Sequence, residues 1–169
     1  LRKDKYVSHY FLKYDKIQAR EYQVQLADQC LQESSVVALP TGTGKTIISL
    51  LCAAERLREF EDSKILFLAP LKPLAKQQAE SFKEFLDINN EKIKVFTGDV
   101  RPAKREQLWD DLDVVFATPQ VIENDIIADR ISLEDVSYTV FDECHRAKGD
   151  YSYTFIAEEY WNTSNNPLV

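Results

Sequence analysis

Two short stretches of this sequence carry the residue types needed for phosphate chemistry. The first, LPTGTGKT at 39–46, lies between an apolar run and a helix-period segment that begins at Ile47. Its glycines free the backbone to wrap N–H groups around phosphate oxygens, and the N-terminus of the following helix adds positive charge. Lys45 supplies a full charge and Thr46 a hydroxyl for Mg²⁺. We therefore predict an ATP and Mg²⁺ site built from Thr41, Gly42, Thr43, Gly44, Lys45 and Thr46.

The first position of this loop departs from the general pattern, which has Gly, often Ala, where this chain has Leu39. That position closes the preceding strand and does not touch phosphate, so we expect Leu39 to pack against its surroundings. A glycine-rich turn that merely precedes a helix is the competing explanation. The joint occurrence of strand, loop, Lys-Thr pair and helix disfavours it.

The second stretch, YTVFDECH at 138–145, places two carboxylates after a short apolar run. In a parallel sheet the carboxyl ends of the strands face the ligand crevice. There Asp142 would hold Mg²⁺ together with Thr46, and Glu143 would orient and deprotonate the water that attacks the γ-phosphate. Glu143 and Lys45 are thus the predicted catalytic residues. An isolated Asp-Glu pair is also a common helix start.

Histidine and cysteine add little further chemistry. His145 is expected to link the hydrolysis site to a neighbouring motif or domain, although a surface histidine would look the same in sequence. Cys144 is interpreted as a small packed residue and not a nucleophile. Cys30, Cys52 and Cys144 are isolated and odd in number, which predicts reduced thiols and no disulfide framework.

The elements that position these residues follow an α/β pattern. Short apolar runs alternate with helix-period segments, which is typical of a mainly parallel sheet covered by helices. The helical stripes run through Tyr22–Leu31, Ile47–Leu57 and Leu74–Phe85, and Tyr22 is assigned to packing. The expected strands are 35–40, 64–70, 92–98, 113–119 and 138–143.

Length and composition allow one ordinary folded domain of 169 residues, with 44% hydrophobic residues and four glycines. No apolar run approaches the roughly 20 residues of a membrane span, and the first residues lack the core of a signal peptide. We expect a protein that is not secreted, has no membrane partner, and works in the cytoplasm or nucleoid of a prokaryote or the nucleus of a eukaryote.

Charge is unevenly distributed along the chain, and its net value of -7 is the wrong sign for a nucleic-acid-binding domain. Residues 69–105 carry 8 Lys/Arg against 5 Asp/Glu, whereas residues 106–169 carry 3 against 14. The middle segment is therefore the part that a phosphate backbone would touch. Solvated helix faces with no partner would explain the same charges.

The motifs together resemble a known family. The loop PTGTGKT, the box DECH, and REYQ at 20–23 resemble the first motor domain of superfamily 2 DExH-type helicases, a three-layer αβα RecA-like P-loop NTPase fold. AAERL, LAPLKPLAKQQAESF and the segment 117–157 look like the archaeal Hef and Fanconi anaemia group M branch. The resemblance makes 1–19 an N-terminal flanking segment and 1–169 a helicase ATP-binding domain that stops before the third helicase motif.

The same resemblance assigns further sites by position. It makes Arg20 and Gln23 the adenine contacts, although spacing alone fits a polar helix start equally well. It implies that three loops, each following a strand, form the nucleic-acid track, although Pro and Gly are common in any loop. Lys76, Lys83, Lys104 and Arg105 either add positive field to that track or are solvated surface. The track residues are Pro70, Lys72, Pro73, Thr97, Gly98, Thr118, Pro119 and Gln120.

The resemblance implies an ATP-dependent DNA helicase or translocase that acts on branched or forked DNA in repair, with a second RecA-like domain as partner. Because that domain would supply an arginine to the γ-phosphate, residues 1–169 alone should hydrolyse ATP very weakly. DECH stands where the Hef branch has DEAH, so a duplex-RNA-stimulated DExH ATPase stays open as an alternative. A non-helicase P-loop ATPase and a binding module without catalysis are the other classes.

Overall fold

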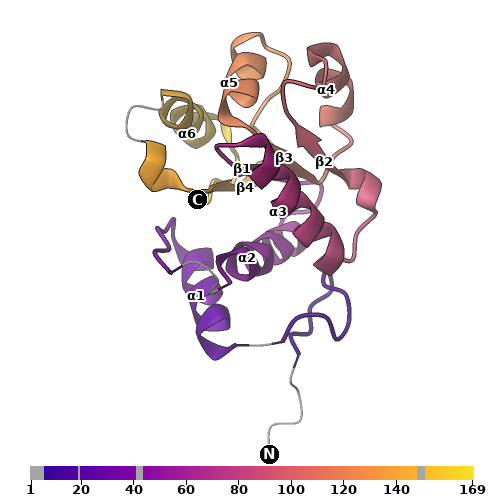
Figure 1. Ribbon diagram of the computed structural model, residues 1–169, viewed down its shortest axis with the longest axis vertical. Coiled ribbons are helices and arrows are strands. Elements are labelled where there is room, and N and C mark those ends of the chain that lie inside the picture. Colours follow the sequence, from indigo (N-terminus) through magenta and orange to yellow (C-terminus); the bar gives the residue numbers. More distant parts are fainter. Residues whose placement is uncertain (1–5, 19, 41–43, 148–150) are drawn as a thin grey trace, which may run out of the picture.

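The centre of the molecule is a four-stranded sheet in which all strands are parallel. The computed structural model describes residues 6–18, 20–40, 44–147 and 151–169 (Figure 1). The strands are β1 (Lys64–Leu68), β2 (Ile93–Phe96), β3 (Val114–Ala117) and β4 (Val136–Phe141), in the order β2-β3-β1-β4. Four of the five predicted strands are confirmed.

Helices cover both faces of this sheet, because alternate residues of each strand are buried on opposite sides. Ile65 and Phe67 of β1 join the core beneath α2 (Lys45–Glu59) and α3 (Lys72–Phe85), with α1 (Glu21–Gln32) packed on α2. Leu66 and Leu68 join the core beneath α4 (Pro102–Trp109), α5 (Pro119–Ile127) and α6 (Tyr151–Thr163). Figure 1 shows the two helical layers on either side of the strands. The predicted three-layer αβα architecture is confirmed.

The strand predicted at 35–40 is wrong. The Ser35 N–H donates to the Val169 carbonyl at 2.9 Å, and the Thr139 N–H donates to the Leu168 carbonyl at 2.9 Å. Leu168 and Val169 therefore lie between this segment and β4. A strand needs a neighbour along its length to pair its backbone groups. Only Leu168 and Val169 bridge the two segments, so residues 35–40 do not join the sheet, and Val36 is 82% exposed.

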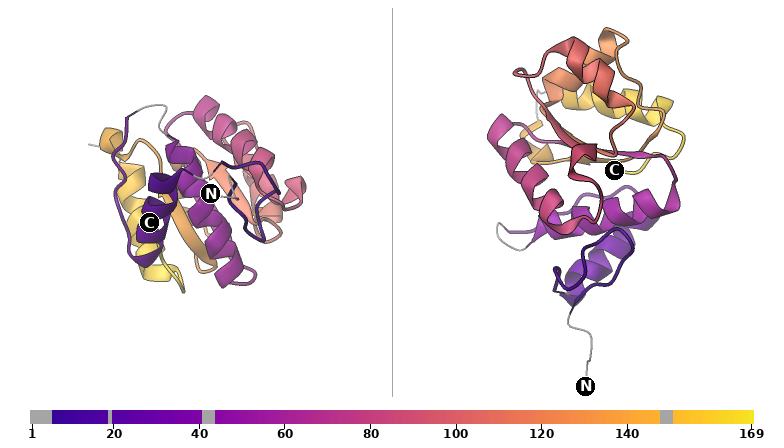
Figure 2. Two further views of the ribbon diagram at one scale, coloured as in Figure 1. Left: turned by 90° about the horizontal axis from the view of Figure 1, so that it is seen from below. Right: turned by 90° about the vertical axis from the view of Figure 1, so that its right-hand side faces the viewer.

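The described part of the N-terminal flanking segment packs against the domain. Leu12 and Ile17 are buried in the same core as α2 and α3. The Lys13 N–H donates to the Phe85 carbonyl at 2.9 Å, just before the chain leaves α3. Figure 2 shows this segment as irregular chain against the layer of α1, α2 and α3, so residues 6–18 pack onto that helical layer.

The cysteines are free thiols, as predicted. Cys30 and Cys52 are buried, and burial raises the pKa of Cys52 to about 12, which keeps its thiol protonated and unreactive. The expectation that Cys144 is packed is wrong. It lies exposed in the short 3-10 helix η2 (Cys144–Ala147), because the chain turns outward immediately after β4.

Candidate nucleotide site and nucleic-acid loops

The predicted phosphate-binding loop meets α2 at a glycine that cannot be replaced without strain. Gly44 has φ +84°, in the left-handed region, and a Cβ built on it would lie 2.2 Å from the Gln23 Nε2. Any side chain here meets both a backbone penalty and a clash. Leu39 packs partly buried against the core, as expected. Thr41, Gly42 and Thr43 lie outside the described residues.

The first turn of α2 presents the two predicted phosphate and metal groups. Lys45 is exposed at the helix N-terminus, and the helix, which is described in full, has no acidic residue in its first turn. No side chain in the first turn of α2 therefore offsets the positive end of the helix dipole. Thr46 is half-buried, and its hydroxyl donates to the Gln78 Oε1 of α3 at 3.0 Å.

Asp142 follows β4 directly, as predicted, and its backbone is held from two sides. Its N–H donates to the Leu68 carbonyl at 2.9 Å, which extends the ladder between β4 and β1. The buried Tyr153 hydroxyl donates to the Asp142 carbonyl at 2.8 Å and lies 3.3 Å from the Leu68 carbonyl. Sequence reasoning missed Tyr153, because a tyrosine in a helix carries no signal of its partner.

Glu143 occupies a strained backbone position beside Asp142. Its φ is +56°, which a residue with a Cβ adopts at a cost of roughly 1–2 kcal/mol. Its N–H donates to the Asp142 Oδ1 at 3.1 Å, which helps hold this turn. The His145 Nε2 lies 3.2 Å from the Glu143 Oε2, and the histidine is 71% exposed. His145 therefore contacts the predicted catalytic base, and its exposed imidazole ring is also accessible to a neighbouring motif or domain.

Burial raises the pKa of Asp142, and the neighbouring Glu143 carboxylate raises it further, while Lys45 and His145 oppose the shift. The folded chain thus favours the protonated acid. The resulting contribution to stability is present at low pH and is lost as the pH rises through the folded pKa. At neutral pH the ionised Asp142 carboxylate therefore lowers the stability of the fold, and a bound cation would offset this cost.

We expect Asp142→Asn to raise the Tm of the chain at pH 7, by on the order of 1–3 °C, because it removes a half-buried charge. The gain should vanish as the pH falls below about 3, where the aspartate is protonated in both states. Thermal unfolding of wild type and variant across this range checks it. Asp87→Asn, at an exposed aspartate, is the control, and equal gains for both variants would contradict this reading.

The donor set at this edge fits Mg²⁺ held together with a triphosphate. Mg²⁺ in such sites takes one or two protein oxygens and leaves its other positions to phosphate and water. Asp142 offers one carboxylate directly after β4, and Thr46 offers one hydroxyl at the start of α2, a helix that contacts β4. Within the described residues no group of three His, Cys, Asp or Glu side chains forms a cage of the kind that a tightly chelated metal needs.

The two predicted adenine contacts lie at the start of α1. Gln23 is only 4% exposed, and its Nε2 lies 3.4 Å from the Gly44 carbonyl, so it faces the phosphate-binding loop. Arg20 is exposed, and its NH1 lies 3.4 Å from the Tyr22 hydroxyl. Tyr22 is 38% exposed, so it is only partly covered and lies outside the buried core. Adenine recognition by Arg20 and Gln23 stays a prediction.

The three predicted nucleic-acid loops lie side by side. They follow β2, β3 and β1, which are neighbours in that order, so their loops meet at one edge of the sheet. The Thr118 N–H donates to the Phe96 carbonyl at 3.3 Å, which joins two of the loops directly. Gly98, Pro73 and Gln120 are exposed, and Pro70, Lys72 and Thr118 are half-buried. Thr97 and Pro119 are buried, so neither of them is accessible to a ligand in this conformation.

The basic residues of the middle segment differ in their surroundings. Lys72 forms an ion pair with Asp99, which follows Gly98 in the next loop. Lys83 pairs with Glu80 at 3.0 Å, whereas Lys76 and Lys104 are exposed. The pairing of Lys72 with Asp99 is not predictable from local sequence, because the two residues lie 27 positions apart and follow different strands.

The expectation for Arg105 is wrong, because its side chain is neither solvated nor available to raise the electrostatic potential along the predicted nucleic-acid track. It is 4% exposed, and its Nε and NH2 donate to the Asp125 carboxylate at 2.5 and 2.7 Å. Its NH1 also donates to the Val100 carbonyl in the loop after β2. Asp125 lies in α5 and is fully buried. Arg105 thus ties together the loop after β2 and the helix that follows Thr118.

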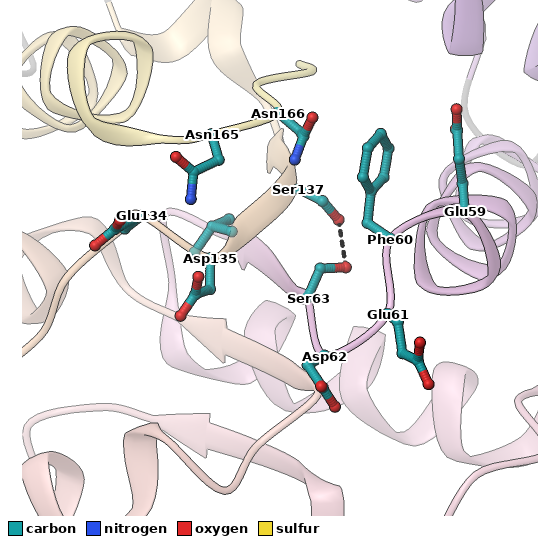
Figure 3. Close-up of a pocket in the computed structure, with 11 residues that line it drawn as sticks. Glu59, Phe60, Glu61, Asp62, Ser63, Glu134, Asp135, Ser137, Asn165 and Asn166 are labelled. Carbon is teal, nitrogen blue, oxygen red and sulfur yellow. Dashed lines mark hydrogen bonds between the residues drawn. The ribbon is translucent and has the colours of Figure 1, made fainter.

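A cavity of about 390 Å³ lies at the opposite edge of the sheet (Figure 3). It is lined by the residues that precede β1 and β4, and a hydrogen bond of 2.8 Å joins the Ser63 and Ser137 hydroxyls there. Five of its lining residues are acidic, and they would repel a triphosphate. This cavity is therefore a poor candidate for a nucleotide site, and the carboxyl edge of the sheet stays the predicted one. The acidic residues are Glu59, Glu61, Asp62, Glu134 and Asp135.

Comparison with known proteins decides the family. The sequence profile described as DEAD/DEAH box helicase matches residues 20–162, most of the chain. The chain belongs to the DEAD/DEAH box helicase family. Its fold is similar to the crystal structure of the Hef helicase domain of Pyrococcus furiosus, with a TM-score of 0.90 and 48% identity over 94% of this chain and 33% of that one. The helicase domain described above is thus a first RecA-like domain of superfamily 2, as the motifs predicted.

Relatives of this helicase domain come from archaea and eukaryotes. It is 39% identical to the helicase MJ1505 of Methanocaldococcus jannaschii over 92% of this chain and 20% of the relative, and 39% identical to FANCM of Arabidopsis thaliana over 83% and 10%. It is 37% identical to MPH1 of Candida albicans over 82% and 12%. The first two are named as RNA helicases and the third as a DNA helicase.

The helicase domain therefore spans a fifth or less of these relatives. In the parts of the chain that the structure describes, every helix is too short or too polar to cross a membrane.

Proposed function

We propose that this chain is the ATP-binding motor domain of a DNA translocase that remodels branched or forked DNA, working with a second RecA-like domain. The observation that carries the proposal is a convergence at one edge of the sheet. Lys45, Thr46, Asp142 and Glu143 supply the groups for Mg-ATP, and three loops along the same edge offer backbone N–H groups and Lys72 to phosphates.

The roles of the side chains follow from their positions. Lys45 and the first turn of α2 would hold the β- and γ-phosphates, and Thr46 and Asp142 would hold Mg²⁺. The metal ion supplies charge neutralisation for the transferring phosphoryl group. Glu143 accepts the proton of the attacking water, and His145 keeps one oxygen of that carboxylate in a fixed direction.

A second motor domain would complete this half-site. An arginine supplied to the γ-phosphate from outside is worth about 10³–10⁵ in phosphoryl-transfer rate. We therefore propose that residues 1–169 alone bind nucleotide and hydrolyse it very slowly, and that DNA-stimulated turnover belongs to the longer protein. The small share of each relative that this chain covers supports that division. The protein would act in the nucleoid of a prokaryote or the nucleus of a eukaryote.

The loops contact phosphates and leave base edges unread, so the choice between DNA and RNA needs an experiment. ATPase rates of the full-length protein should be measured with forked DNA, single-stranded DNA and duplex RNA at one salt concentration. Forked DNA is expected to stimulate most. Stronger stimulation by duplex RNA would favour the second candidate, an RNA-stimulated DExH ATPase, which the names of two relatives support. No stimulation by any of them would favour a non-helicase P-loop ATPase.

We expect Asp99→Asn to tighten nucleic-acid binding by about two- to tenfold at low salt, because it frees Lys72 for a phosphate. The slope of log affinity against log salt should steepen by just under one unit. Glu91→Gln makes the same charge change at the Lys94 pair on the opposite edge of the sheet and is the control. Equal affinity for Asp99→Asn and wild type would place Lys72 outside the track.

A further inference from the structure

The hydrogen bond between Thr46 and Gln78 joins the two functional parts of the domain. Thr46 is the second residue of α2, in the nucleotide site, and Gln78 lies in the second turn of α3, whose first turn carries Lys72 and Pro73. The two residues are 32 positions apart in sequence, and the Thr46 Oγ1 donates to the Gln78 Oε1 at 3.0 Å in a half-buried setting. We propose that Gln78 is a positioning residue that aims the Thr46 hydroxyl at the metal.

The chemistry of a hydroxyl explains why an acceptor is needed at this place. A threonine hydroxyl has one hydrogen and two lone pairs, and a metal ion requires a lone pair. When the Gln78 Oε1 accepts the hydrogen bond from the Thr46 hydroxyl, the lone pairs of the Thr46 oxygen remain available on the side away from α3. The bond to Gln78 holds the Thr46 hydroxyl in one direction before nucleotide binds.

The position of Gln78 gives this bond a second consequence. α2 and α3 pack against each other on the same face of the sheet, and α3 leads from Gln78 back to the loop that holds Lys72. Nucleic acid that shifts the start of α3 would therefore shift the acceptor of the Thr46 hydroxyl. This inference rests on the proposed function.

The decisive experiment measures binding of a fluorescent ADP to the chain as Mg²⁺ is titrated, and again in excess EDTA. Gln78→Met keeps the length of the side chain and removes the acceptor. We expect it to raise the Mg²⁺ concentration for half-saturation by about tenfold, as the loss of a residue that orients a metal ligand does. Affinity in EDTA should not change. Gln78→Glu keeps an acceptor oxygen and should retain the wild-type Mg²⁺ concentration for half-saturation.

The neighbouring Gln77, which is exposed on the same helix, offers a matched control, and Gln77→Ala should behave as wild type. An unchanged Mg²⁺ requirement in Gln78→Met, or an equal loss of affinity with and without Mg²⁺, would overturn the inference and leave the proposed function intact. Absence of Mg²⁺-dependent binding in the wild type would overturn both. If Gln78→Met does not fold, Gln78→Asn, whose amide is too short to reach Thr46, is measured in its place.

Discussion

Glu143→Gln is expected to lower the ATP turnover of the full-length protein by about 10²–10⁴-fold and to leave nucleotide affinity within twofold. The amide keeps the size of the side chain and can still orient water, but it cannot accept a proton. The carboxylate sits beside Asp142 at the carboxyl edge of β4, in a strained turn that the Asp142 side chain and His145 hold. Single-turnover hydrolysis and equilibrium binding of ATP separate the two effects.

The control for this variant is His145→Gln, which removes the partner of Glu143 and leaves the base in place. It should cost far less in turnover than the loss of the carboxylate. Turnover of Glu143→Gln within a factor of ten of wild type would show that another group activates the water. An equal loss of nucleotide affinity would show instead that Glu143 acts in binding.

Asp125→Ala is expected to lower the free energy of unfolding by about 3–5 kcal/mol, because it leaves the Arg105 guanidinium buried without a counterion. Arg130 also loses its contact with Asp125 Oδ1, at 3.2 Å. Urea denaturation of the chain measures the change. Asn124→Ala, at the exposed neighbour in α5, is the matched control and should cost less than about 1 kcal/mol.

Replacement of both partners tests whether the cost comes from the unpaired charge. Arg105→Met with Asp125→Leu removes both charges and keeps apolar volume, so it should be far less destabilising than Asp125→Ala. Because Arg105 also holds the Val100 carbonyl, the double variant should still weaken nucleic-acid binding through the loop after β2. A double variant as unstable as the single one would contradict the account of this pair.

Much of the domain could be predicted from sequence because local patterns encode it. The run of β-branched and aromatic residues at Val114–Ala117 specifies a strand buried on both faces, and the loop before Lys45 specifies the start of a helix. Asp142 and Glu143 could be placed because they follow such a run directly. In each case the information lies within a few residues of the feature it determines.

The errors came where a residue depends on a distant partner. Val36 belongs to a strand-like sequence, but a strand also needs a paired neighbour, which periodicity does not reveal. Arg105 looked like surface charge because its partner Asp125 lies 20 residues away in another helix. Tyr153 and Gln78 gave no signal for the same reason: each acts through a hydrogen bond to a residue that only the fold brings near.

The most direct test of the central claim is the equilibrium binding of Mg-ATP to the chain, compared between two variants at opposite edges of the sheet. Lys45→Ala removes the charge at the start of α2, and Asp135→Ala alters the acidic cavity of Figure 3. We predict one Mg²⁺-dependent site in the wild type, at least tenfold weaker binding in Lys45→Ala, and wild-type affinity in Asp135→Ala. Unchanged affinity in Lys45→Ala, or binding lost in Asp135→Ala, would contradict a nucleotide site at the carboxyl edge.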